Sequence, residues 1–106
     1  MAPELSIPVL WSVDRAPHVA GRLDLYHDRL HLDGGSRDDR RTLDVDAAEV
    51  AAVRIGREGG DRIGGRAVLL IELRDGAVLS VAGLQAAGML HELAERIDAM
   101  TPPGDG

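Results

Sequence analysis

Apolar and polar residues alternate along most of the chain, which is the pattern of half-buried β-strands. The clearest case is a pair of runs at 23–26 and 30–33, in which leucines alternate with polar residues. The short polar step His27-Asp28 separates the two runs, so the pair predicts a β-hairpin. The same alternation predicts strands at residues 9–14, 23–26, 30–33, 41–45, 50–55, 67–73 and 77–82.

Short polar segments between these strands predict the connections. Residues 46–49 indicate a turn or a single helical turn, and Gly56 to Gly65 indicates a glycine-rich, charged loop. Asp75-Gly76 predicts a tight turn, because this pair accommodates a positive φ.

The period of the pattern changes after residue 85. Apolar residues then recur at steps of three and four, with charged residues on the other side, which predicts an amphipathic helix of about four turns. Thr101-Pro102-Pro103 ends this helix, because proline cannot continue the helical hydrogen bonds. The predicted inward face consists of Ala86, Met89, Leu90, Leu93, Ile97 and Met100.

The length of 106 residues predicts a single domain. We expect a lead-in at 1–8, which contains two prolines, a folded domain at 9–100 and a flexible tail at 101–106. The first residues lack a basic region followed by a long apolar run, so no signal peptide is predicted. No run of 18 apolar residues predicts a membrane span, and the expected location is cytoplasmic.

Composition narrows the class of partner. The chain is 44% hydrophobic and 28% charged, as folded domains are, and it contains no cysteine for disulfides or thiolate chemistry. Its net charge of -6 opposes binding to nucleic acid, because phosphate neutralisation dominates that affinity. The same charge opposes loose adhesion to an anionic membrane.

The first predicted hairpin carries a family motif. Residues 21–32 read Gly-Arg-Leu-Asp-Leu-Tyr-His-Asp-Arg-Leu-His-Leu. They resemble the Gly-x-Leu-x-Leu-Thr-x-x-Arg-Leu-x-Phe hairpin of GRAM and bacterial pleckstrin-homology (PH) domains, with Tyr26 in place of Thr and Leu32 in place of an aromatic residue. Residues 43–50 look like the family's step between its two sheets, and 69–81 look like its last hairpin.

The resemblance covers about residues 9–100 and implies a mainly β, PH-like fold. Such a fold has seven antiparallel strands in two near-orthogonal sheets, a β-sandwich or partly open barrel, with the C-terminal helix closing one end. It also implies a binding module instead of a catalyst. In this family, anions or phosphoinositide headgroups often bind opposite the helix, among loops that correspond here to 14–22, 33–41 and 74–75.

Those three loops carry a net charge of only +1. A polyphosphate headgroup needs several converging cationic donors, so the match is poor and solvated loops with local Asp–Arg pairs are the favoured explanation. Headgroup or anion binding is kept as an alternative. Its candidate residues are Arg15, Arg22, Arg40, Arg41 and Arg74.

A second cationic segment spans residues 54–66 and carries a net charge of +2. Its two Gly-Gly pairs and its arginines suit a contact surface for an anion or an acidic partner, although an ordinary hairpin connection fits the same composition. It is not a P-loop, because no Gly-Lys-Ser/Thr follows. The candidate contact residues are Arg54, Arg57, Arg62 and Arg66.

No residue pattern indicates catalysis, a cofactor or a metal. His27 and His31 lie in one hairpin with Asp28 and Asp33 beside them, but a metal site needs three or more convergent ligands. We interpret the histidines as surface residues, and we predict no catalytic residues and no enzyme.

The strand at 67–73 is apolar on both faces, which indicates that it is covered twice. Val68 and Leu70 lie on the face opposite Leu69, and their cover is either the N-terminal segment around Pro8 or another subunit.

Taken together, these patterns predict a small non-catalytic PH-like module that binds a protein partner or itself, as a dimer for example. The alternatives are a headgroup or anion binder, which is the one route to a membrane contact, and a small-molecule carrier or enzyme of unknown class. Nucleic acid is not an expected partner.

Overall fold

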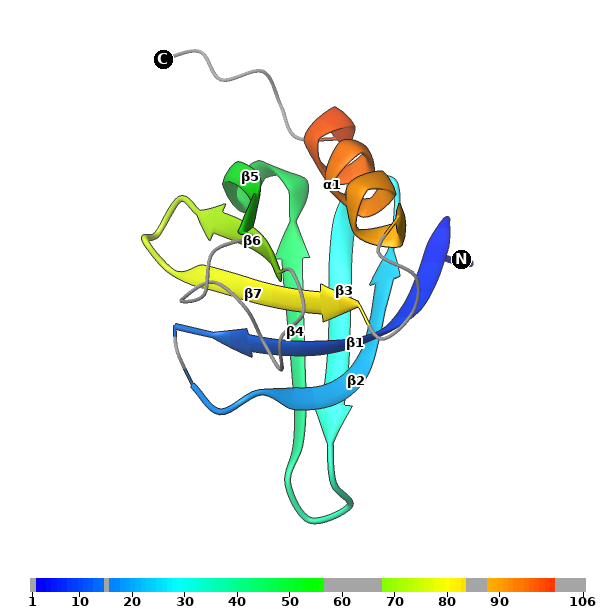
Figure 1. Cartoon of the computed structure of the whole chain (residues 1–106), viewed down its shortest axis with the longest axis vertical. Helices are drawn as coiled ribbons and strands as arrows, with labels where there is room; N and C mark the ends of the chain where they lie inside the picture. The colour runs from blue at the N-terminus through cyan, green and yellow to red at the C-terminus, as the bar shows by residue number, and fades with distance from the viewer. Residues whose placement is uncertain (1, 15, 57–67, 84–87, 101–106) are drawn as a thin grey trace.

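The computed structural model describes residues 2–14, 16–56, 68–83 and 88–100. Within these ranges the chain forms seven β-strands, one short 3-10 helix and one α-helix (Figure 1). The elements are β1 (Leu5–Val13), β2 (Val19–Leu25), β3 (Arg29–Gly35), β4 (Arg40–Asp46), η1 (Ala47–Glu49), β5 (Val50–Gly56), β6 (Val68–Leu73), β7 (Val78–Gly83) and α1 (Gly88–Met100). Every predicted strand and the predicted helix are confirmed.

All the strands lie in one antiparallel sheet, in the order β4-β3-β2-β1-β7-β6-β5. Strand β1 is the junction, because it pairs with β2 on one side and with β7 on the other. The sheet curls, so that β3 and β4 run across the direction of β1 and β7 in Figure 1. The two near-orthogonal sheets that were predicted are therefore two halves of one continuous half-barrel.

The first strand begins at Leu5, earlier than the alternation predicts. The predicted strand begins later because of Pro8, since proline cannot donate a hydrogen bond to the sheet and indicates a break in a strand. In the structure β1 pairs with β2 from Leu5 to Trp11, whereas its pairing with β7 begins only at Val9. Pro8 therefore lies where β1 has a neighbour on one side only, which is an edge position that tolerates proline.

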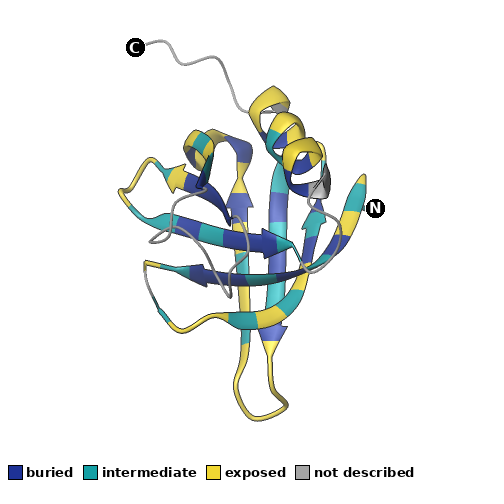
Figure 2. Cartoon of the chain, in the orientation of Figure 1, coloured by how far each residue is buried: buried dark blue, intermediate teal, exposed yellow. Residues whose placement is uncertain are grey.

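The main core fills the inner face of the half-barrel, and α1 closes one end of it. Leu90, Leu93 and Ile97 of α1 enter the same buried cluster as the leucines of β2 and β3. The opposite side of α1 is exposed (Figure 2). The rest of the predicted inward face lies outside the described residues, namely Ala86 and the side chains of Met89 and Met100. No helix in the described part of the chain is long and apolar enough to cross a membrane.

A second, smaller apolar cluster lies on the outer face of β6 and β7. It consists of the buried residues Val68, Leu70 and Ala82, with Leu10 and Val78 packed against them. The prediction that β6 is covered on both faces is confirmed by this burial. The segment around Pro8 is not the cover, because it forms strand β1 of the same sheet. Val68, Leu70 and Ala82 are buried within the single chain, so their burial does not require a second subunit, and self-association stays a prediction.

The turns follow their sequence signals. In the β2–β3 turn the backbone N–H of Tyr26 donates to the carbonyl oxygen of Arg29 at 2.9 Å. Gly76 in the β6–β7 turn has a φ of +94°, in the left-handed region that favours glycine. At η1 the Glu49 carboxylate accepts a hydrogen bond from the Asp46 backbone N–H at 3.3 Å, so the step between β4 and β5 is one tight helical turn.

Candidate binding site

The β1–β2 loop and the beginning of β4 meet at the end of the half-barrel that lies away from α1 (Figure 1). Asp14, at the start of the β1–β2 loop, donates its N–H to the carbonyl oxygen of Val78 at 2.9 Å. Its carboxylate accepts from the Val78 N–H, also at 2.9 Å, and so ties this loop to the beginning of β7. Arg41, beside the β3–β4 loop, donates to the carbonyl oxygen of Pro17 at 3.4 Å. These contacts bring β1 and β4, which are not neighbours in the sheet, to one opening.

A pocket of about 490 Å³ lies at this opening. Pockets for small ligands or side chains have volumes of roughly 300–1,000 Å³, so this one has the size of a binding site. It is formed by the end of β1, the beginning of β2 and the beginning of β4. The lining residues are Trp11, Ser12, Val13, Ala16, Val19, Arg40, Arg41, Thr42 and Leu43.

Trp11 gives the pocket a fixed apolar wall. The residue is 4% exposed, and its indole Nε1 donates to the carbonyl oxygen of Asp33 at 2.9 Å. Gly34 leaves the space that the indole occupies, because a Cβ at that position would lie 3.0 Å from Nε1 and 2.8 Å from the Ala20 carbonyl oxygen. The orientation of Trp11 is therefore set by both a hydrogen bond and close packing.

Three further apolar side chains complete the wall. Val13, Val19 and Leu43 are half-buried and pack against the main core. Sequence reasoning missed them and Trp11 as site residues, because each occupies an ordinary inward position on a strand. Nothing local in the sequence shows that the space in front of them is unfilled.

Among the described lining residues the charged ones are both cations, Arg40 and Arg41, and none is a carboxylate. The Arg41 side chain is 38% exposed and pairs with exposed Asp39 at 3.6 Å, a contact that solvent weakens. Arg40 is exposed, and its side chain makes no hydrogen bond or ion pair within the described part of the chain. In a chain of net charge -6, these two arginines give the described lining a positive charge that Asp39 partly offsets.

The structure separates the other arginines that were candidates for a headgroup site. Arg22 lies on β2, where its guanidinium donates to Ser6 Oγ at 3.2 Å. Arg74 donates from Nε to the carbonyl oxygen of Ala48 at 2.9 Å and so fastens η1 to the β6–β7 turn. Arg15 lies outside the described residues. Of the four candidates that the structure describes, Arg40 and Arg41 line the pocket.

The second predicted cationic surface falls mostly outside the described residues. Arg54 is exposed on β5. Arg57, Arg62 and Arg66 belong to the range 57–67, which the structure does not describe.

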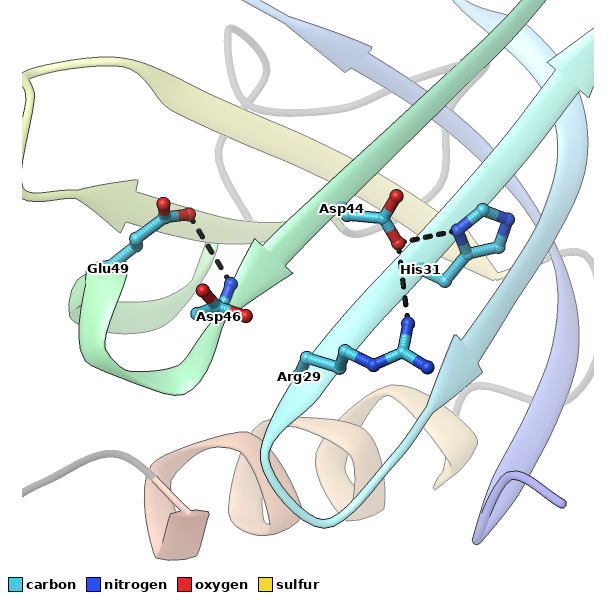
Figure 3. Close-up of polar contacts among 5 residues, drawn as sticks. All are labelled: Arg29, His31, Asp44, Asp46 and Glu49. Atoms are coloured by element: carbon cyan, nitrogen blue, oxygen red, sulfur yellow. Dashed lines mark hydrogen bonds and ion pairs between the residues drawn. The ribbon is translucent and has the colours of Figure 1, made fainter. Parts of the chain in front are cut away.

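A polar cluster on the outer side of β3 and β4 was not predicted (Figure 3). One carboxylate oxygen of Asp44 lies 2.7 Å from His31 Nδ1 and 3.5 Å from Arg29 Nη1. Asp28 and Asp33 were the expected neighbours of His31, but the strand register places Asp44 directly opposite it. The described residues contain no group of three side chains that could hold a metal ion.

No protein-family model matches the chain, and no curated protein matches its sequence. Among solved structures, the C-terminal PH domain of human FYVE, RhoGEF and PH domain-containing protein 3 (FGD3) matches with a TM-score of 0.68 and 14% identity. The match covers 99% of this chain and 93% of that domain.

Two further structures agree. The PH domain of USP37 matches with a TM-score of 0.59 and 13% identity, over 91% of this chain and 93% of that one. An activated truncation of Vav1 matches with a TM-score of 0.66 and 11% identity over 93% of this chain, which spans only 26% of the Vav1 chain. Likeness at these identities concerns the fold. The strand order, the curled sheet and the closing helix all agree with it, and the chain has the pleckstrin-homology-like fold.

Proposed function

We propose that this protein is a small non-catalytic PH-like interaction module that holds a protein partner at the open end of its half-barrel. Modules with this fold commonly bind proteins or lipids. The observation that carries the proposal is the pocket, which combines a fixed apolar wall at Trp11 with the cations Arg40 and Arg41. An apolar centre with a polar rim is the usual composition of a protein contact.

The chemistry of the lining supports a non-catalytic role. Among the described lining residues, Ser12 and Thr42 carry hydroxyl groups, the Ser12 hydroxyl is buried, and none is a histidine or a carboxylate that could act as a base. A hydroxyl nucleophile needs such a base to become reactive. The described lining is therefore equipped to bind and orient a group.

Site-specific photocrosslinking in the source cell tests this proposal. A photoreactive p-benzoylphenylalanine replaces Thr42, which is exposed at the pocket, and in a matched control it replaces Glu95, which is exposed on α1. We expect a protein adduct from position 42 that is absent from position 95. Equal adducts at both positions, or none at position 42, would contradict a partner at the open end.

Headgroup or anion binding is the second candidate, and the absence of a carboxylate from the described lining residues favours it. Against it, Arg22 and Arg74 are engaged elsewhere, which leaves Arg40 and Arg41 among the described candidates for a highly charged group. Co-sedimentation with phosphatidylinositol 4,5-bisphosphate vesicles, compared with phosphatidylcholine vesicles, distinguishes the two. A headgroup site predicts binding to the first only, which Arg40→Gln with Arg41→Gln abolishes.

Two further parts of the proposal concern location and assembly. We place the module in the cytoplasm, and cell fractionation tests this. Self-association and a contact surface around Arg54 also remain proposed, and light scattering at several concentrations measures the mass directly. If the measured mass stays at that of one chain at every concentration, self-association is contradicted.

A further inference from the structure

We propose that the open-end pocket selects an apolar group that carries a single carboxylate. This inference rests on the proposed function, because it names the chemistry by which the same site recognises its ligand. It differs from headgroup binding in both the charge and the polarity of the ligand.

The walls argue for an apolar body. Val13, Val19 and Leu43 are partly buried members of the main core, so their remaining exposed surface is what the pocket presents. Trp11 adds an aromatic face whose Nε1 is already bonded to the Asp33 carbonyl oxygen and is not available to a polar ligand. Covering this surface releases water from apolar groups, which favours an aliphatic or similar ligand.

The rim argues for one negative charge. Arg40 and Arg41 are consecutive at the start of β4, both line the pocket, and no carboxylate is among the described lining residues. A guanidinium binds a carboxylate through two parallel hydrogen bonds, and Arg41 has only the exposed Asp39 as an ionic partner. The two described cations suffice for one carboxylate, whereas a polyphosphate carries more negative charge than these two arginines can match.

The size of the pocket sets the size of the group. A volume of about 490 Å³ is at the lower part of the range for ligand sites and suits a few apolar side chains or a medium-length aliphatic chain. The same chemistry has two sources, the C-terminal residue of a partner chain and a free aliphatic acid. The experiment below separates them.

Trp11 provides the measurement, because it is the one tryptophan of the chain and lies in the pocket wall. Its single indole N–H signal in an NMR titration reports occupancy of this site. The probes are octanoate, acetyl-Leu-Leu with a free carboxylate, acetyl-Leu-Leu amide, octylammonium and inositol hexakisphosphate. We expect saturable shifts with the two carboxylates, and at least about tenfold weaker binding of the amide and of octylammonium, from the loss of a charge-assisted hydrogen bond.

The variants test which residues bind the carboxylate. The double variant Arg40→Gln/Arg41→Gln should weaken the binding of octanoate about tenfold or more, since both charge-assisted partners are lost. Thr42→Glu adds a negative charge at an exposed lining position and should also weaken the binding of octanoate, without changing the core. Arg96→Gln removes an arginine from exposed α1 and should leave binding unchanged. Tighter binding of acetyl-Leu-Leu than of octanoate indicates a chain end, and the reverse indicates a free acid.

Several results would overturn the inference. If octylammonium or the amide bound as tightly as octanoate, the site would not select a carboxylate. If inositol hexakisphosphate bound more tightly than octanoate, the preferred ligand would be a polyphosphate. Shifts that do not change in Arg40→Gln/Arg41→Gln or Thr42→Glu would place the carboxylate elsewhere. A protein crosslinked from position 42 without carboxylate binding would support the proposed function and contradict this inference. Carboxylate binding without a crosslinked protein would support the carboxylate site and contradict the protein partner.

Discussion

The apolar interior of the half-barrel is fully covered at one end and only partly covered at the other. At the closed end α1 inserts Leu93 and Ile97, both 0% exposed, and so fills the space with the chain's own side chains. At the open end Val19 and Leu43 stay half-buried around a pocket. Apolar burial that the chain completes itself serves stability, whereas burial left incomplete beside two arginines is available to a ligand. Substitutions at the two ends should therefore affect stability and binding in different proportions.

The largest effect on stability is expected at the closed end. Leu93→Ala should lower the free energy of unfolding by about 2–5 kcal/mol, because it removes a fully buried side chain and leaves a cavity. Urea denaturation followed by circular dichroism measures the change. Glu95→Ala, an exposed position on the same helix, is the control and should change stability little. A loss from Leu93→Ala below that of the control would mean that α1 does not close the core.

The next effect is expected where Trp11 is held. Gly34→Ala should cost about 1–3 kcal/mol, because the added methyl group would crowd the Trp11 indole and the Ala20 carbonyl oxygen. It should also shift the tryptophan emission. Gly83→Ala is the control, since a Cβ there would meet nothing within 4 Å. Unchanged emission in Gly34→Ala would show that the indole is not packed as described.

A smaller loss of stability is expected at the open end itself. Leu43→Ala should cost about 1 kcal/mol, because a half-buried leucine contributes only part of the free energy of a buried one. Binding of octanoate should weaken in the same variant, whereas Leu93→Ala should leave binding intact at temperatures where it stays folded. If Leu43→Ala matched Leu93→Ala in stability and spared binding, the contrast between the two ends would be wrong.

The smallest effect on stability is expected in the outer polar cluster of Arg29, His31 and Asp44, which belongs to neither end of the half-barrel. Asp44→Asn should cost about 0.2–1 kcal/mol at low salt, because Asp44 is an exposed partner of His31 and Arg29. The difference should shrink at high salt, where surface charges are screened. Asp98→Asn, an exposed position on α1, is the control. A loss that does not respond to salt would contradict a surface ion pair.

The local parts of the fold were predictable from the sequence, and the site was not. Alternation identifies each strand because inward and outward positions differ in polarity along the strand itself. The pocket depends on the curl of the sheet, which brings β1 next to β4 although β2 and β3 separate them in the sheet order. No pattern within either strand records this approach.

The same limit explains the arginines. Loop composition placed Arg22, Arg40, Arg41 and Arg74 in one candidate group, but their partners come from other elements. The Arg74 guanidinium bonds to a carbonyl oxygen of η1, and the Arg22 guanidinium bonds to a serine of β1. Tertiary contacts decide which arginine stays available to a ligand. In the same way, strand register decides that Asp44 is the partner of His31.

The position of β1 in the sheet has a consequence for how the chain folds. Every pair of neighbouring strands is consecutive in the sequence except β1 and β7, where Val9 pairs with Gly83. The chain is thus two meanders joined at one seam, and closing that seam requires the largest loss of chain entropy. We expect this step to set the folding rate, with substitutions at the β1–β7 seam slowing folding and those in the outer strands mainly speeding unfolding.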